Sequence, residues 1–259
     1  MQPQIPPDVA RLIDDLLGGT LSALGDNLVG FYLSGSLALG GFDSKTSDVD
    51  VVVVTERPLS AAEMEALTRL HERLPPNGNA CSQQYEVYYL DRATVRKFAH
   101  GQQHVKVGPD EPLHQTEHRP NWVIERWTVR ERGIVLAGPD PATLIDPVSP
   151  DDLRNAAIDE IRTRLDRWSE GRWPVDELSH RGSQAFEIHT ACRALYTAES
   201  GELATKAQAV TWALKILPPR WHPLVEWSQH HRGELAHDTD KVPEIMAFLR
   251  WAAANGEAA

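Results

Sequence analysis

Apolar residues change their spacing near the middle of the chain. Before residue 138, short runs rich in β-branched and aromatic residues predict strands at 28–33, 48–55, 83–90 and 133–138. Apolar residues at helical spacing predict helices at 8–24, from Ser60 to the PPNGN sequence at 75–79, and around Trp122. Beyond residue 150 only the helical period remains, which predicts helices at 151–168, 178–199, 205–216, 219–231 and 241–254.

A proline-rich stretch separates the two patterns. The sequence GPDPATLIDPVSP at 138–150 contains four prolines, which disfavour regular secondary structure. Ser149 and Pro150 then provide a strong helix start. We therefore expect an α/β domain at 1–150, an all-α helical bundle domain at 151–259, and a cleft between them.

Composition and charge narrow the class of protein. Hydrophobic residues make up 41% of the 259, enough for a sizeable core, and no apolar run is long enough to span a membrane. The N-terminal residues lack the apolar stretch of a signal peptide. The formal net charge of −11 argues against nucleic-acid binding and suits a cationic small-molecule partner. Cys81 and Cys192 lie outside any metal-ligand pattern, so we expect buried or idle thiols of a reducing cytoplasm. We also expect a monomer.

Two aspartates interrupt the second predicted strand, in the sequence SDVDVVVV at 47–54. Residues i and i+2 of a strand point the same way, roughly 6 to 7 Å apart, so Asp48 and Asp50 are expected to share one side. Two such carboxylates raise each other's pKa unless a cation neutralises them. Mg²⁺ prefers oxygen ligands of this kind, and we expect the pair to hold it.

The residues upstream of the aspartates indicate what the metal serves. In the sequence SGSLALGG at 34–41, Ser34, Gly35 and Ser36 follow the first strand and precede a short helical turn. Gly35 would let the backbone approach a phosphate, and Ser36 would donate its hydroxyl to it. A phosphate cradle before a carboxylate pair is typical of a site for a nucleoside triphosphate with metal. The glycine spacing matches neither the P-loop nor the dinucleotide-binding fingerprint.

The sequence GSLALGGFDSKTSDVDVVVV at 35–54 resembles the motif of the nucleotidyltransferase superfamily. Residues 131–153 and 192–221 are similar to the streptomycin/spectinomycin (3'')(9) adenylyltransferases, and the similarity covers nearly the whole chain, being weakest at about 92–120. The resemblance implies a nucleotidyltransferase domain with a mixed sheet, followed by a helical bundle. It also implies an enzyme that transfers AMP from Mg-ATP to an aminoglycoside hydroxyl and releases pyrophosphate.

The same resemblance implies roles for individual residues. Asp48 and Asp50 match the metal ligands, and Glu86 matches the general base that acts on the substrate hydroxyl. The residues implied in nucleotide binding are Gly35, Ser36, Ser47, Arg193, Lys206 and His231. The residue pattern agrees for Glu86: if the third strand lies beside the second, this carboxylate faces the same edge as the aspartates and is free to take a proton.

The acceptor site departs from the family. Ser183 stands where the family has a drug-binding carboxylate, and Glu187, Asp176 and Glu177 are alternatives nearby. The family's aromatic drug contact falls in the poorly matched stretch, where we expect a loop and where Trp122 or His114 would serve. Two other functions remain open from the sequence. One is AMP transfer to a protein or a non-drug metabolite, and the other is a non-catalytic nucleotide-binding regulator of the same fold.

Overall fold

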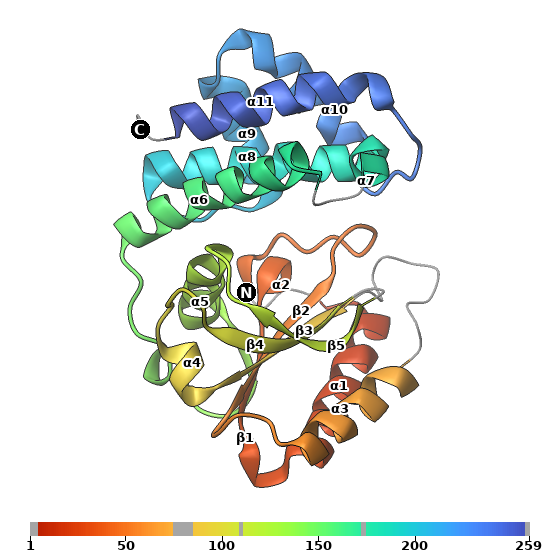
Figure 1. Cartoon of the computed structure of the whole chain (residues 1–259), viewed down its shortest axis with the longest axis vertical. Helices are drawn as coiled ribbons and strands as arrows, with labels where there is room; N and C mark the ends of the chain where they lie inside the picture. Colours follow the sequence, from red (N-terminus) through yellow and green to blue (C-terminus); the bar gives the residue numbers. More distant parts are fainter. Residues whose placement is uncertain (1–4, 75–84, 109–110, 172–174, 257–259) are drawn as a thin grey trace. The chain divides into compact units, whose positions relative to one another are not determined.

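The structure is a computed structural model that describes residues 5–74, 85–108, 111–171 and 175–256. The chain divides into two compact units, Met1–Val148 and Ser149–Ala259 (Figure 1). The first unit contains strands and helices, whereas the described part of the second is helical.

The first unit is built on a six-stranded sheet with the order β5-β4-β3-β2-β1-β6. Strands β2 and β3 run parallel, and the other neighbouring pairs are antiparallel, which confirms the mixed sheet. The strands are β1 (Leu28–Leu33), β2 (Val49–Thr55), β3 (Tyr85–Asp91), β4 (Gln103–Gly108), β5 (Glu111–Glu117) and β6 (Ile134–Ala137).

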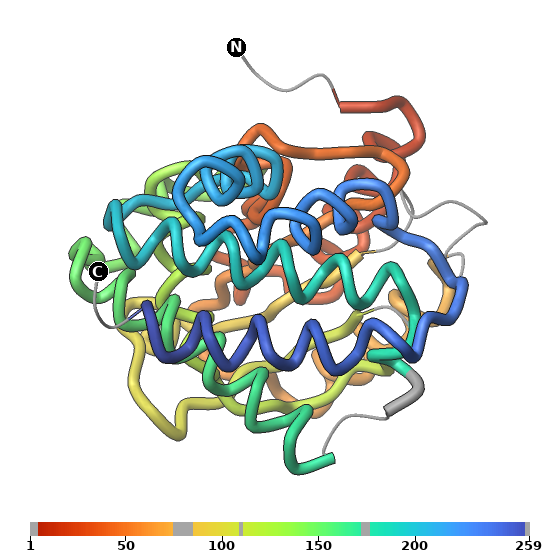
Figure 2. Tube along the Cα trace, turned by 90° about the horizontal axis from the view of Figure 1, so that it is seen from above, coloured from red at the N-terminus to blue at the C-terminus, as the bar shows by residue number. Residues whose placement is uncertain are grey.

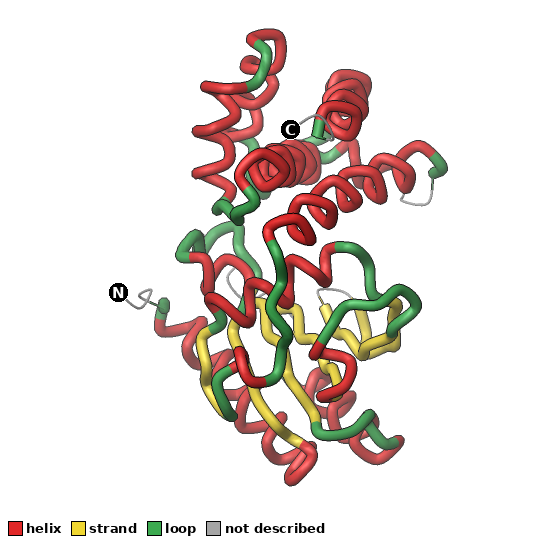
Figure 3. Tube along the Cα trace, turned by 90° about the vertical axis from the view of Figure 1, so that its left-hand side faces the viewer, coloured by secondary structure: helices red, strands yellow, loops and turns green. Residues whose placement is uncertain are grey.

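Helices cover both faces of this sheet (Figure 3). Because side chains alternate along a strand, Val51 of β2 packs in one core with α1 (Pro7–Leu24) and α3 (Ala61–Arg73). Val52 packs on the opposite face, in the core that includes α4 (Arg92–Arg96) and α5 (Asn121–Arg132). The short helix α2 (Gly35–Leu39) connects β1 to the loop before β2.

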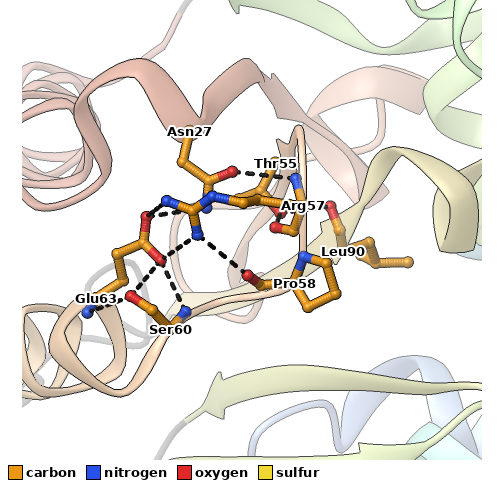
Figure 4. A network of polar contacts seen from close by, with 7 residues as sticks. All are labelled: Asn27, Thr55, Arg57, Pro58, Ser60, Glu63 and Leu90. Atoms are coloured by element: carbon orange, nitrogen blue, oxygen red, sulfur yellow. Dashed lines mark hydrogen bonds and ion pairs between the residues drawn. The ribbon is translucent and has the colours of Figure 1, made fainter.

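A polar network at the C-terminal end of β2 fixes the start of α3 (Figure 4). The helix begins with a capping box at the predicted start: Ser60 caps the helix, and the Glu63 carboxylate accepts from the Ser60 amide at 2.7 Å. Glu63 also accepts from Asn27 Nδ2 at 3.0 Å and pairs with Arg57 at 3.0 Å. Burial opposes ionisation of Glu63, but Arg57 and Ser60 outweigh it and lower the pKa of this carboxyl to about 2.

Helix α8 (Arg181–Ser200) is the centre of the second unit and contacts its other helices (Figure 2). These are α6 (Pro150–Ser169), α7 (Val175–Ser179), α9 (Lys206–Ile216), α10 (His222–His230) and α11 (Val242–Asn255). Cys192 of α8 is buried, and burial raises the pKa of its thiol to about 12, so it stays protonated and inert. Cys81 lies outside the described residues. Among the helices described, none is both long and apolar enough to cross a membrane.

The hairpin of β4 and β5 occupies residues where the sequence predicts a loop. Its strands are short, and polar residues stand at many of their positions, so the alternation of apolar residues is weak. The hairpin is ordered by pairing with β3, for example Tyr88 opposite Lys106. The expected loop was therefore wrong. Pairing with β3 stabilises two strands that their own residues favour only weakly.

Two buried histidines lie at this hairpin, His104 in β4 and His118 directly after β5. His104 and His118 are 5% and 4% exposed, and their rings lie 4.7 Å apart. Burial is the main cause that lowers the pKa of each ring to about 3; His118 adds to the effect on His104, and Arg126 adds to it on both. Both rings are therefore neutral in the folded chain.

We expect the free energy of unfolding to fall as the pH drops from about 6.5 towards 3, because the unfolded chain binds protons that the folded chain excludes. The slope contributed by each ring is about 1.4 kcal/mol per pH unit at most. Urea unfolding followed at pH 7.5 and pH 5 measures it. His118→Gln should flatten the pH dependence, and the exposed His100→Gln should leave it unchanged. Identical pH dependence in all three chains would contradict the assignment.

Candidate active site

Two of the predicted carboxylates, Asp50 and Glu86, lie side by side on one face of the sheet. Asp48 immediately precedes β2, and Asp50 is the second residue of that strand. The parallel pairing of β2 with β3 places Asp50 opposite Glu86. Their neighbours Val51 and Val87 point to the other face, into the core. The sequence predicted that Glu86 would face the same edge as the aspartates if the two strands were neighbours. The register of β2 and β3 places it beside Asp50.

The turn before α2 is built against Asp50. The Ser34 amide donates to the Asp50 carbonyl at 2.9 Å, and the Ser34 hydroxyl donates to Glu125 Oε2 at 3.2 Å. Gly35 has φ +54°, and a Cβ at this position would lie 1.8 Å from Asp50 Oδ2. A side chain is excluded there for both reasons. Gly35 therefore makes room for the Asp50 carboxylate. The sequence had predicted only that Gly35 lets the backbone approach a phosphate.

Two serines of the predicted nucleotide site differ in their surroundings. Ser36 Oγ is buried and has no hydrogen-bond partner among the described residues, so it holds an unused donor beside the Asp50 turn. Ser47 is 7% exposed, and its Oγ accepts from the Asp43 amide at 3.0 Å. Its own amide donates to the Asp43 carbonyl at 2.8 Å, so Ser47 closes the turn that leads into Asp48.

Two hydrogen-bond donors that the sequence did not predict hold Glu86. Lys106 Nζ of β4 lies 3.1 Å from Glu86 Oε1, and the Tyr88 hydroxyl donates a short hydrogen bond to Oε2. Burial lowers the pKa of Lys106, but Glu86 and Glu111 raise it more, so the net shift is upward. Burial and the nearby carboxylates, Glu86 first, raise the pKa of Tyr88 well above its usual value. Lys106 is therefore a cation and Tyr88 a neutral donor.

The carboxylates at this face fit a metal that arrives with a nucleotide. Within the described ranges, no three His, Cys, Asp or Glu side chains converge as a metal cage. Mg²⁺ is usually held by one or two carboxylates together with substrate phosphate oxygens, and keeps waters. Asp48 and Asp50 would supply the carboxylates, and the lack of a side chain at Gly35 leaves room for that of Asp50. The donor set therefore suits Mg²⁺ bound to a triphosphate.

The second unit brings basic residues of three helices together. Lys206 opens α9, and its ammonium lies 4.8 Å from the ring centre of Phe186 on α8. The Arg164 guanidinium of α6 lies 5.1 Å from the same ring. Arg193 of α8 donates to the Ala204 carbonyl, two residues before Lys206, at 3.2 Å. Arg164 is paired with Glu160 at 2.8 Å and with Glu187 at 2.6 Å, so its charge is offset within the unit. We call Arg193 and Lys206, the two residues predicted to bind phosphate, the basic cluster.

Three further residues of the second unit were predicted to contact the nucleotide or the acceptor. Glu187 is buried and pairs with Arg164 at 2.6 Å, so its placement as an acceptor contact is corrected to an internal ion pair between α6 and α8. Burial raises the pKa of Glu187, against the opposing effect of Arg164. His231 ends α10 and pairs with Glu234 at 2.9 Å, with its ring 4.4 Å from that of Trp227. Ser183 lies in the first turn of α8 and is partly exposed.

The two residues proposed as ring contacts for the acceptor lie in different surroundings. Trp122 is 3% exposed, with its ring 5.1 Å from Tyr88 and 4.6 Å from His104. Trp122 therefore packs against Tyr88 from within the core. The expectation that it stacks on an acceptor is not met, because its ring is buried. His114 of β5 pairs across the hairpin with Lys106, the residue that contacts Glu86, and is partly exposed. Glu177 of α7 is exposed, and the side chain of Asp176 lies outside the described residues.

Comparisons with known proteins identify both units. The family model described as "Nucleotidyltransferase domain" matches residues 19–127, and the one described as "Aminoglycoside adenylyltransferase, C-terminal domain" matches residues 143–254. "Spectinomycin 9-adenylyltransferase" of Staphylococcus aureus (strain N315) is 29% identical over 255 residues, which cover 93% of this chain and 90% of that protein. "Aminoglycoside (3'') (9) adenylyltransferase" of Rhizobium radiobacter is 32% identical over 127 residues, 47% of this chain and 43% of that protein.

A solved structure shares the fold. The crystal structure of spectinomycin adenyltransferase AAD(9) from Enterococcus faecialis with ATP and spectinomycin matches with a TM-score of 0.75, covering 96% of this chain and 99% of that one. At 16% identity this likeness concerns the fold alone. Two adjoining family models and a relative that matches most of the chain lead to one conclusion: the chain belongs to the aminoglycoside adenylyltransferase family of nucleotidyltransferases.

Proposed function

We propose that this chain transfers AMP from Mg-ATP to a hydroxyl of an aminoglycoside-type small molecule and releases pyrophosphate. The observation that carries the proposal is the register of β2 and β3, which sets Glu86 beside Asp50 on one face of the sheet. A site that only binds nucleotide has no use for this third carboxylate. Membership of the adenylyltransferase family supports the same reaction.

In the proposed reaction, the acceptor oxygen attacks the α-phosphorus of ATP, and the bond to the pyrophosphate oxygen breaks. Glu86 accepts the proton of the hydroxyl, because it is the carboxylate beside Asp50 that metal binding leaves available. Mg²⁺ held by Asp48 and Asp50 would offset negative charge on the phosphates. Ser36 would donate its unused hydroxyl to a phosphate oxygen.

Phosphate binding is proposed to draw on the basic cluster. The chain carries a net charge of −11, so a local group of cations favours an anionic ligand against the overall field. Arg193 and Lys206 would bind phosphate oxygens, with Lys206 kept in place by the ring of Phe186. Ser47 and Gly35 would act indirectly, by shaping the turns that hold Asp48 and Asp50. We retain His231 as an adenine contact, through the ring that already faces Trp227.

For the acceptor we propose spectinomycin before streptomycin. Relatives named spectinomycin 9-adenylyltransferase match 93% of the chain, whereas those named for both positions match about half of it. Ser183 in place of a drug-binding carboxylate, and the buried Trp122, both remove contacts expected for streptomycin. Carboxylates around Glu86 suit an acceptor with ammonium groups. An enzyme that consumes ATP would act in the cytoplasm, and we propose that it does so as a monomer.

A screen of acceptors tests this function. The purified chain is incubated with Mg-ATP and one acceptor at a time, and pyrophosphate release is measured. Spectinomycin should give turnover, with streptomycin slower. Turnover only with a protein or an unrelated hydroxylated metabolite would support the alternative substrates. Tight ATP binding with no turnover on any acceptor would support a nucleotide-binding regulator.

A further inference from the structure

A lysine of the hairpin lies beside the proposed general base. Lys106 is paired with Tyr88 of β3 on one side and with His114 of β5 on the other, so the three side chains form a row across one face of the sheet. Glu86 is two residues before Tyr88 and points to the same face. Pairing of β4 with β3 thus brings a cation from residue 106 to a carboxylate at residue 86.

Both oxygens of the Glu86 carboxylate have a donor. Lys106 Nζ lies 3.1 Å from Oε1, and the Tyr88 hydroxyl bonds to Oε2. A carboxylate oxygen offers about two acceptor positions, so each oxygen keeps one for an incoming hydroxyl. Two donors from different strands fix the plane of the carboxylate more closely than one donor does. The remaining acceptor positions therefore point in defined directions.

The packing around this ion pair is close. A Cβ at Gly108 would lie 3.3 Å from Glu86 Oε1 and 3.4 Å from Lys106 Cε, so the backbone of β4 closely approaches the pair. Lys106 Nζ also lies 3.2 Å from Glu111 Oε2, which holds the ammonium from the other side. The Lys106 and Glu86 side chains are 21% and 25% exposed. Partial burial strengthens such a pair relative to one on the open surface.

We propose that Lys106 is a positioning residue of the site: together with Tyr88 it holds the Glu86 carboxylate in the orientation that receives the acceptor hydroxyl. This inference rests on the proposed function and adds to it a residue that acts through Glu86. Lys106 stays protonated between its two carboxylates, so it cannot itself remove the proton. Its contribution is geometric, and its loss should lower the rate of transfer more than the binding of either substrate.

Kinetics of three variants test the proposal. Lys106→Met keeps the length of the side chain and removes the charge. It should lower kcat for AMP transfer by roughly tenfold or more, with the KM values for ATP and acceptor within about threefold. Lys106→Arg should recover most of the rate, because each carboxylate makes a single contact with the ammonium. The exposed Lys97→Met is the matched control and should behave like the wild type. Unchanged kcat in Lys106→Met, or no recovery in Lys106→Arg, would overturn the proposal.

A second measurement does not depend on activity. Thermal unfolding is compared for the wild type, Lys106→Met, Glu86→Gln and the double variant. If Lys106 holds Glu86, the loss of Lys106 should lower the Tm of the wild type more than it lowers the Tm of Glu86→Gln. Equal shifts in both backgrounds would show that the pair is not formed in solution. A wild type that transfers no AMP refutes the proposed function, and the comparison of Tm values still decides whether Lys106 holds Glu86.

Discussion

Asp48→Asn and Asp50→Asn are each expected to lower the rate of AMP transfer by roughly a thousandfold or more, while the chain stays folded. An asparagine keeps the shape of the side chain but supplies no negative charge to a divalent cation. The backbone at Gly35 also packs closely against the Asp50 carboxylate. Single-turnover transfer from labelled ATP, measured over a range of Mg²⁺ concentrations, gives the rate and its metal dependence.

The matched control for this pair is Asp26→Asn. Asp26 is exposed in the short turn before β1, so its loss should change neither the rate nor the metal dependence. Circular dichroism of all variants checks the fold. Turnover at a wild-type rate in Asp48→Asn or Asp50→Asn, with ordinary Mg²⁺ dependence, would remove these residues from the metal site.

Glu86→Gln is expected to lower the rate of adenylylation by ~10²- to 10⁴-fold, the range typical for loss of a general base. Glutamine keeps the shape and still accepts a hydrogen bond, but it cannot take up the proton of the acceptor hydroxyl. The affinity for ATP should stay within a few-fold of the wild type, because the phosphates and the metal are assigned to other residues. Calorimetry with ATP beside single-turnover transfer at saturating acceptor separates binding from chemistry.

The control for Glu86→Gln is Glu117→Gln, at the exposed end of β5, which should transfer AMP at the wild-type rate. Transfer at a near wild-type rate by Glu86→Gln would place the base elsewhere, with Asp176 and Glu177 the next candidates. Loss of ATP binding together with activity would instead make Glu86 a metal or structural ligand.

Local patterns were sufficient to predict the elements around Asp48 and Asp50. The glycine and serine of residues 35–36 and the alternation around Asp50 act over a few residues, and they imply a strand, a turn and a strand without long-range information. The capping boxes at Ser60 and Ser149 are equally local, and both helices begin there in the structure. The helical second unit, predicted from the helical spacing alone, is confirmed, and so is the mixed sheet, which the family resemblance implied.

The contacts that hold Glu86 required the tertiary structure. Lys106 reaches it only because β4 pairs with β3 in one register, and a shift of one residue would turn Lys106 to the other face. Glu187 gave the converse error. It reads as an available carboxylate, but the packing of α6 on α8 sets Arg164 beside it, 23 positions away along the chain. Neither partner is encoded by local spacing.

The most direct test of the account is the fate of the α-phosphate of ATP in the presence of spectinomycin. The wild-type chain, Asp50→Asn and Glu86→Gln are each incubated with ATP labelled at the α-phosphorus, Mg²⁺ and the drug, and the products are separated and identified by mass spectrometry. The account predicts labelled AMP joined to spectinomycin in the wild type, with one pyrophosphate released per adduct, and strongly reduced adduct in both variants at unchanged fold. An adduct formed equally well by all three chains would contradict it, as would pyrophosphate released by the wild type with no AMP on the drug.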